Sequence, residues 1–344
     1  MQLIKPDINI DFIGKRKIAY TVSLLMILAS LISLVIHKGP NYGIDFAGGT
    51  VVQIRFSAPV KIADVKDGLK SVQLSASSVQ RFGEKTDNEV LIRTDASVDA
   101  AKGFAPHLAK AMKASTGADA EIRRVEMVGP QVGKDLREKA LFAMFYALLF
   151  ITIYISGRFE FKWMISGIMA ATLAGSVYLL SVFHFSIPLL MLTALVVTLF
   201  LFWFLELKYA MGAIVALIHD VTITVGLFSI FDKEFTLPII AALLTIIGYS
   251  LNDTIIVFDR IRENLKKQHR KPLSWILNRS VNETLSRTLL TSGTTLVVVV
   301  CLLVLGGGII HDFAFAMTAG IIVGTYSSIY VASPILLAWQ AKKK

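Results

Sequence analysis

Long apolar runs alternate with short polar turns over most of the 344 residues, and one extended polar stretch interrupts them. An apolar run of about 20 residues is long enough to cross the hydrocarbon core of a membrane as a helix. The pattern therefore predicts an α-helical polytopic membrane protein. Eight membrane helices are expected, at about residues 18–36, 136–156, 163–183, 189–205, 210–231, 237–258, 287–305 and 313–339.

The polar stretch divides the chain into three parts. Residues 1–36 hold the N-terminus and the first helix, which is long for a signal peptide and lacks a cleavage motif, so we interpret it as a retained anchor. Residues 37–131 form an extracytoplasmic domain, and residues 132–344 form a membrane domain of seven helices.

The extracytoplasmic domain has its own periodicity. Period-two and helical patterns alternate in the order βαββαβ, which is typical of a ferredoxin-like α+β domain. The expected elements are strands at 50–56, 77–82, 89–94 and 119–128 and helices at 62–71 and 100–115. We find no nucleophile, metal-ligand spacing or phosphate loop in this domain, so no enzyme, metal or cofactor is predicted.

A motif rich in glycine opens this domain. Asp45, Gly48, Gly49 and Thr50 belong to the sequence GIDFAGGT. Glycines at this spacing favour a tight turn that feeds a strand. Ligand binding is the alternative, and the turn is the interpretation that we favour.

Charge assigns a side of the membrane to each loop. The net charge is +10, which either a nucleic-acid-binding protein or a membrane protein with basic cytoplasmic loops could carry. Lys and Arg gather before the first helix, at 158–162, at 260–279 and at 342–344, while the intervening loops lack such an excess. With eight spans these basic segments share one side, so we expect both termini in the cytoplasm and no nucleic-acid partner.

Two further segments have distinct patterns. The sequence FEFKW at 159–163 resembles LELKY at 205–209, and similar turns follow both, so residues 157–206 look like an added helical hairpin. Chance similarity between apolar helices is the alternative. Residues 273–285 have apolar positions at helical spacing, which predicts a cytoplasmic helix in the membrane interface, in contact with lipid headgroups or, less simply, a partner.

Ionisable side chains inside apolar runs are the candidate functional residues, because a charge in the membrane is costly. Asp253 lies seven residues before Arg260, with Asn252 beside it, and Arg287 begins the next helix at a similar depth. Asp220, next to His219, lies near the bilayer midplane. Structural alternatives exist, because Arg287 could reach the interface and Asp253 could lock two helices together.

Small and hydroxylated residues accompany these charges. Gly248 precedes Asn252 by one turn, Thr291 and Thr294 follow Arg287, and Gly320 and Gly324 form a G-x-x-x-G pair. Such residues allow close helix packing in membranes. The sequence therefore predicts a polar inner seam between the last four helices.

This seam could carry protons. A carboxyl group can take up and release a proton, whereas arginine keeps its charge. Asp253 is the expected proton carrier and Arg287 its movable counter-charge, so separation of the pair would favour proton uptake. Whether Asp220 carries protons or only pairs with His219 stays open at this stage.

Several motifs, in order along nearly the whole chain, resemble the SecF family of SecD/SecF proteins, which are RND-type membrane proteins. The motifs are GIDFAGGT at 43–50, VGPQVG at 128–133, RFE at 158–160, HDV at 219–221, the stretch 248–264 and RTLLTSGTT at 287–295.

The resemblance implies a function and partners. It implies a subunit of the protein-export machinery in the cell inner membrane that uses the proton motive force together with SecD. It further implies association with the SecYEG channel and YajC and contact with a translocating unfolded polypeptide. The family's proton-path acid and arginine match Asp253 and Arg287. The chain departs from the family's usual six helices by the two extra spans at 157–206.

Two other functions remain open on the sequence. One is a related exporter of small molecules or lipids, which would need a second half. The other is a scaffold of the translocon that conducts no protons, which the charges inside the membrane disfavour.

Overall fold

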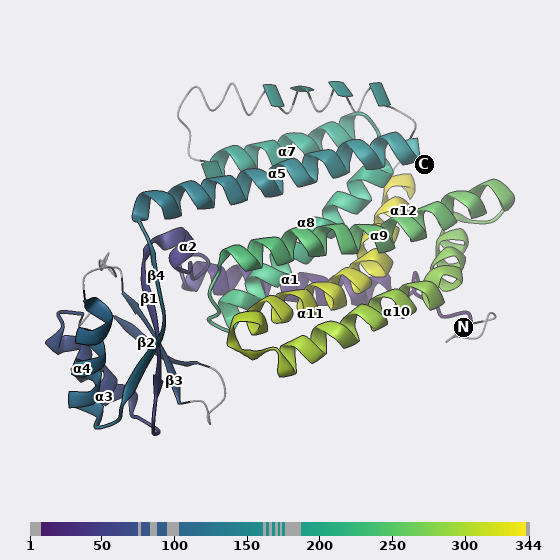
Figure 1. Ribbon diagram of the computed structural model, residues 1–344. Helices are drawn as coiled ribbons and strands as arrows, with labels where there is room; N and C mark the ends of the chain where they lie inside the picture. The colour runs from purple at the N-terminus through teal and green to yellow at the C-terminus, as the bar shows by residue number, and fades with distance from the viewer. Residues whose placement is uncertain are drawn as a thin grey trace.

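The computed structural model describes residues 8–74, 77–82, 88–94, 103–160, 163–164, 167–168, 171–172, 174–175 and 187–341. Within these residues a small sheet domain lies at one end of a long bundle of helices (Figure 1). In this described part of the chain, six helices are long and apolar enough to cross a membrane. The helix expected at 163–183 lies mostly outside the described residues, and so do residues 184–186 of the hairpin repeat.

The sheet domain contains the expected elements, with small shifts at their ends. They are β1 (Gly49–Phe56), α3 (Ile62–Ser71), β2 (Ser78–Phe82), β3 (Glu89–Thr94), α4 (Phe104–Thr116) and β4 (Ala120–Val128). The strands pair antiparallel in the order β2-β3-β1-β4. The two helices cover one face (Figure 1), where Ile54 and Ile92 of the sheet pack against Val65 and Leu108.

The helical bundle has a buried centre and an exposed periphery. Its elements are α1 (Arg16–Ile36), α2 (Ile44–Ala47), α5 (Pro130–Glu160), α7 (Ile187–Phe204), α8 (Lys208–Ile230), α9 (Leu237–Lys267), α10 (Leu273–Leu305), α11 (Gly307–Ser327), η1 (Ser328–Ala332) and α12 (Ser333–Ala341). In the most apolar part of each span, 61% of the α8 residues are buried but only 17% of the α10 residues. We infer that α8 is central and that lipid or a partner covers α10.

Several predicted boundaries were wrong: α5 begins at Pro130 and not at 136, and α11 begins at Gly307 and not at 313. Residues 157–160, expected in a turn, extend α5 by one turn, because Phe159 stacks on Tyr209 and Glu160 accepts a hydrogen bond from the Tyr209 amide (3.1 Å). The helix expected to end at 258 continues to Lys267 through residues that favour helix. The interfacial helix at 273–285 and the membrane helix expected at 287–305 form one helix, α10.

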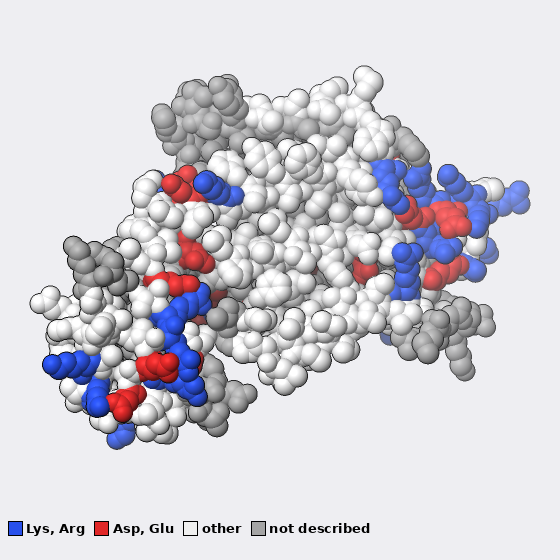
Figure 2. All heavy atoms as spheres, viewed as in Figure 1, with Lys and Arg blue, Asp and Glu red and all other residues white. Residues whose placement is uncertain are grey.

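Charge separates the molecule into three zones. Figure 2 shows Lys, Arg, Asp and Glu gathered over the sheet domain and at the opposite end of the bundle, with a belt between them that is almost free of charge. An uncharged belt between two charged ends is what a membrane-embedded chain requires. The chain is therefore a multi-pass membrane protein with an α+β domain on one side.

Candidate functional site

Asp253 lies in the uncharged belt on α9. Its side chain is buried, and Oδ2 accepts a hydrogen bond from Ser292 Oγ of α10 (3.0 Å). Arg287, one and a half turns before Ser292 on α10, is close enough to act on the carboxyl group electrostatically. Among the described residues, Ser292 is the hydrogen-bond partner of Asp253, and Arg287 acts on Asp253 only electrostatically, without a hydrogen bond or an ion pair. Asp253 and Arg287 can therefore move closer together or farther apart without breaking a bond between them.

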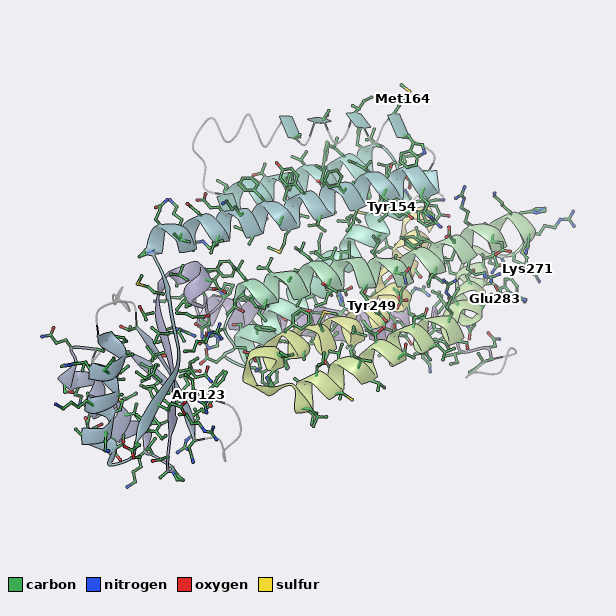
Figure 3. The ribbon with its side chains drawn as sticks, in the orientation of Figure 1. Arg123, Tyr154, Met164, Tyr249, Lys271 and Glu283 are labelled. Atoms are coloured by element: carbon green, nitrogen blue, oxygen red, sulfur yellow. The ribbon has the colours of Figure 1, made fainter. Side chains whose placement is uncertain are left out.

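A polar strip next to this site faces away from the bundle. Gly248 and Asn252 of α9 and Arg287 and Thr294 of α10 are all exposed in the single chain. The predicted position of these residues in an inner seam is therefore wrong, because α9 and α10 turn them outward. Tyr249, labelled in Figure 3 in the middle of the bundle, donates from Oη to the carbonyl oxygen of Thr291 (2.9 Å) and joins the two helices behind the strip.

Asp220 forms a second polar centre, which is fully enclosed. Its Oδ2 accepts hydrogen bonds from Ser250 (2.5 Å) and Ser327 (2.8 Å), and Oδ1 lies 2.9 Å from His219 Nδ1. The other imidazole nitrogen lies 3.1 Å from Ser23 Oγ. Asp220 therefore connects α1, α8, α9 and α11, and both of its carboxylate oxygens have partners.

Sequence reasoning did not predict that four serines, Ser23, Ser250, Ser292 and Ser327, are the hydrogen-bond partners in these two centres. Serines in apolar helices commonly bond to their own backbone, as Ser30 does to the carbonyl oxygen of Met26 (2.8 Å). A lone serine therefore gives no signal.

The predicted packing glycines behave differently from one another. A Cβ atom on Gly320 would lie 2.4 Å from Ile246 side-chain atoms, and one on Gly324 would lie 2.9 Å from Ser250 Cβ, so α11 packs closely on α9 through both. A Cβ atom on Gly248 would meet nothing within 4 Å. Thr291 and Thr294 donate to carbonyl oxygens of their own helix. Gly320 and Gly324 therefore lie at a close contact between α11 and α9, whereas Gly248 lies at no close contact within this chain.

The GIDFAGGT motif joins the sheet domain to the bundle. Asp45 Oδ2 accepts a hydrogen bond from the Leu237 amide (2.8 Å) at the start of α9, where helix amides lack partners in their own helix. Gly48 and Gly49 have positive φ angles of 79° and 115°. A Cβ atom on Gly48 would lie 2.8 Å from Pro130 Cα. Thr50 is buried in β1. The expected turn is present, and it also fixes the starts of α5 and α9.

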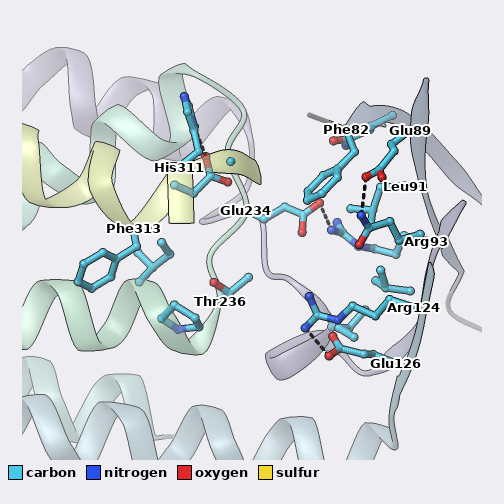
Figure 4. Close-up of a pocket in the computed structure, with 18 of the residues that line it drawn as sticks. Phe82, Glu89, Leu91, Arg93, Arg124, Glu126, Glu234, Thr236, His311 and Phe313 are labelled. Atoms are coloured by element: carbon cyan, nitrogen blue, oxygen red, sulfur yellow. Dashed lines mark hydrogen bonds and ion pairs between the residues drawn. The ribbon is translucent and has the colours of Figure 1, made fainter. Parts of the chain in front are cut away.

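A wide hollow of about 940 Å³ separates the open face of the sheet from the start of α9, the end of α10 and the start of α11 (Figure 4). Arg93 of β3 forms an ion pair across it with Glu234, which precedes α9, and Arg124 pairs with Glu126 on the sheet. Leu305 adds an apolar wall. In the described ranges, no group of three or more His, Cys, Asp or Glu could hold a metal ion.

Known proteins resemble this chain over its whole length. A family model described as "Protein export membrane protein SecD/SecF, C-terminal" matches residues 108–199 and 182–342, and the SecD/SecF GG motif matches residues 33–60. "Protein translocase subunit SecF" of Magnetococcus marinus is 45% identical over 98% of this chain and 94% of its own length. The same subunit of Desulfurispirillum indicum is 40% identical over 97% and 92%.

Solved structures agree with this relationship. The crystal structure of SecDF, a translocon-associated membrane protein from Thermus thermophilus, is 32% identical with a TM-score of 0.71. It covers 99% of this chain, which spans 40% of the SecDF chain. SecDF in a super-membrane-facing form gives 33% identity and a TM-score of 0.63. The chain therefore belongs to the SecF family of protein translocase subunits.

Proposed function

We propose that the chain, an auxiliary and non-enzymatic subunit of the Sec protein-export machinery, couples the proton motive force to export through Asp253 and Arg287. The observation that carries this proposal is the buried Asp253 carboxyl group, which has Ser292 as its one hydrogen-bond partner in the described part of the chain and forms no ion pair with Arg287 there. A buried charge without a full set of partners is unstable, so such a group is suited to change its protonation state.

The exposed polar strip is where we expect SecD to pack. Asn252, Arg287 and Thr294 would otherwise face lipid, which is costly for polar groups in the hydrocarbon region. The open space at Gly248 leaves room for a helix to approach closely. The partner would close the proton path on the side that this chain leaves open.

Asp220 and His219 have a different role in this proposal. Three hydrogen-bonding groups hold the Asp220 carboxyl group, and it is fully buried, so a proton could reach it only if the four connected helices moved apart. We therefore assign the pair to fixing α8 and α9 relative to each other, and the movement of protons to Asp253.

We further propose an inner-membrane topology with both termini in the cytoplasm. Basic residues crowd the end of the bundle that holds the α9–α10 connection, as Figure 2 supports, and Lys271 is labelled there in Figure 3. The sheet domain then lies on the outer side. Its split-βαβ order and antiparallel pairing support the ferredoxin-like class.

The eight-helix count also belongs to this proposal. Residues 182–199 fall in both segments that match the family model, as expected if one part of the model occurs twice in the chain. A duplicated hairpin at 157–206 adds two spans and leaves the side of every later loop unchanged. SecYEG, YajC, membrane lipid and the translocating unfolded polypeptide are the further contacts that we propose.

The function is tested by export into inverted membrane vesicles with and without a proton motive force. Asp253→Asn and Arg287→Met should lower the ratio of the rate with a proton motive force to the rate without one to near one, because each variant removes one of the two interacting charges. Asp220→Asn, the same change at the other buried aspartate, is the matched control and should keep the wild-type ratio. An unchanged ratio in Asp253→Asn would show that this residue does not couple protons to export.

A further inference from the structure

Two asparagines of α10 hold an N-terminal segment, residues 9–13, which we name the strap. Asn282 Oδ1 accepts a hydrogen bond from the Ile10 amide (2.8 Å), and its Nδ2 donates to the Ile10 carbonyl oxygen (2.9 Å). Asn278 Oδ1 accepts from the amides of Phe12 (2.8 Å) and Ile13 (3.2 Å), and its Nδ2 also donates to the Ile10 carbonyl oxygen (3.0 Å). Residues four apart lie on one face of a helix, so both amides reach the same strap.

These contacts recognise the backbone of the strap, and the side chains of the strap add packing. Phe12 and Ile13 are buried in the larger core cluster of the bundle, and the Phe12 ring meets Tyr330 of η1 edge to face at 5.8 Å. The strap then turns into α1 through a hydrogen bond from the Gly14 amide to Asp11 Oδ1 (2.7 Å). It therefore lies between α10 and η1 and fills space that their side chains leave.

The strap sits close, along α10, to the residues of the candidate site. Asn282 precedes Arg287 by five residues and Ser292 by ten, which are rises of about 7.5 and 15 Å along a helix. α10 is helical without interruption from Leu273 to Leu305. A displacement of its first three turns is therefore passed on to Arg287.

We propose that Asn278 and Asn282 are positioning residues, which hold the strap against the cytoplasmic end of α10 and so keep Arg287 at its working distance from Asp253. This inference rests on the proposed function, because the position of Arg287 affects export only if the interaction of Arg287 with Asp253 couples protons to export. An anchor that merely ties down the N-terminus would need neither two amides on α10 nor a place close to Arg287.

The first test reports whether the amides hold the strap. In a Cys301→Ser background, Ile13→Cys places a thiol at a buried strap position, and its labelling by a maleimide is followed in membranes. Asn278→Ala with Asn282→Ala should raise the labelling rate about tenfold, because a released segment opens far more often than a held one. Arg279→Ala, on the same helix but paired with Glu283, should leave labelling unchanged.

The second test reports whether the strap acts on the coupling site. The ratio of export with and without a proton motive force should fall about threefold or more in the double variant, as expected for a positional coupling. Export without the proton motive force should stay at the wild-type level, which a general folding defect would not allow. Unchanged labelling, or increased labelling with an unchanged ratio, overturns the proposal.

A cysteine pair distinguishes loss of the strap's position from a general folding defect. Ile10→Cys with Asn282→Cys removes the hydrogen bonds that the Asn282 side chain makes to residue 10 while the two thiols are reduced. Oxidation replaces these hydrogen bonds with a disulfide. Oxidation should restore the ratio, and failure to restore it after cross-linking counts against positioning. Asp253→Asn is measured alongside. If the export ratio falls in Asp253→Asn but stays at the wild-type value in the strap variants, only the strap inference is wrong. If the ratio stays at the wild-type value in Asp253→Asn, the proposed function itself is wrong.

Discussion

Asp253 and Asp220 are both buried aspartates in the membrane part of the chain, and their surroundings differ. Asp253 has one hydroxyl partner and lies beside an exposed polar strip. Asp220 has two hydroxyl partners and an imidazole and connects four helices. A carboxyl group with a full set of partners stabilises a structure, whereas one with few partners can respond to a change nearby. These surroundings fit the structural role that we propose for Asp220 and the coupling role that we propose for Asp253.

We predict that Asp220→Asn is tolerated better than Asp220→Ala. The amide oxygen of asparagine can still accept from Ser250 and Ser327, and the His219 tautomer can change to accept from the amide nitrogen. Alanine leaves several buried polar groups without partners, at a cost of about 1–3 kcal/mol for each group. The measurement is the thermal unfolding midpoint in detergent. Equal midpoints for the two variants would remove the structural role that we assign to Asp220.

At the residue level the sequence predicted the charged members of the site and not their hydroxyl partners. Asp253, Arg287, Asp220 and His219 are recognisable because charge is rare in apolar runs. The serines that bind them are not rare. Their partners lie 30 to 196 positions away in the chain, and only the tertiary fold brings them together.

At the level of elements, hydropathy placed the helices but did not place their ends. α9 has 31 residues and extends about 46 Å, well beyond the roughly 30 Å of the hydrocarbon core. The apolar run ends near residue 258, but the residues that follow also favour helix. The helix therefore projects past the membrane, and an apolar pattern cannot report where a projecting helix stops.

Two helical glycines provide a matched prediction about packing. A Cβ atom on Gly226 of α8 would lie 2.0 Å from Ser30 Cβ of α1 and 2.6 Å from its Cα, so Gly226→Ala must push the two helices apart. We expect a loss of about 1–3 kcal/mol. Gly248→Ala adds a methyl group in open space and should be neutral or slightly stabilising, because alanine favours helix.

The thermal unfolding midpoint of each variant, purified alone, tests this prediction. Co-purification with SecD then tests the interface, since Gly248→Val should weaken recovery of SecD without lowering the midpoint of the single chain. A fall in midpoint for Gly248→Ala as large as that for Gly226→Ala would mean that Gly248 is packed within the chain.

At the scale of the whole molecule, contacts distant in sequence fasten the sheet domain to the bundle. The Arg93–Glu234 ion pair and the hydrogen bond from the Leu237 amide to Asp45 span the joint. The Gly43 amide also donates to the Phe235 carbonyl oxygen (2.9 Å). The sequence predicted the elements of both parts but not this joint, because no local pattern links residue 45 to residue 237.

This joint connects the charged residues inside the membrane to the sheet domain through α9. α9 begins at the joint with Asp45 and carries Asp253 near its middle. A shift of α9 caused by proton uptake at Asp253 would therefore also move the attachment of the sheet domain. The central claim that this depends on is that Asp253 changes its protonation state.

Infrared difference spectroscopy of the purified chain in complex with SecD tests this claim most directly. As pH is changed, the account predicts a carboxylic-acid C=O stretching band, additional to those of the exposed Asp and Glu residues, that is present in the wild type and in Asp220→Asn and is missing from Asp253→Asn. Identical titrating bands in the wild type and in Asp253→Asn would contradict the account, because another carboxyl group would then carry the proton.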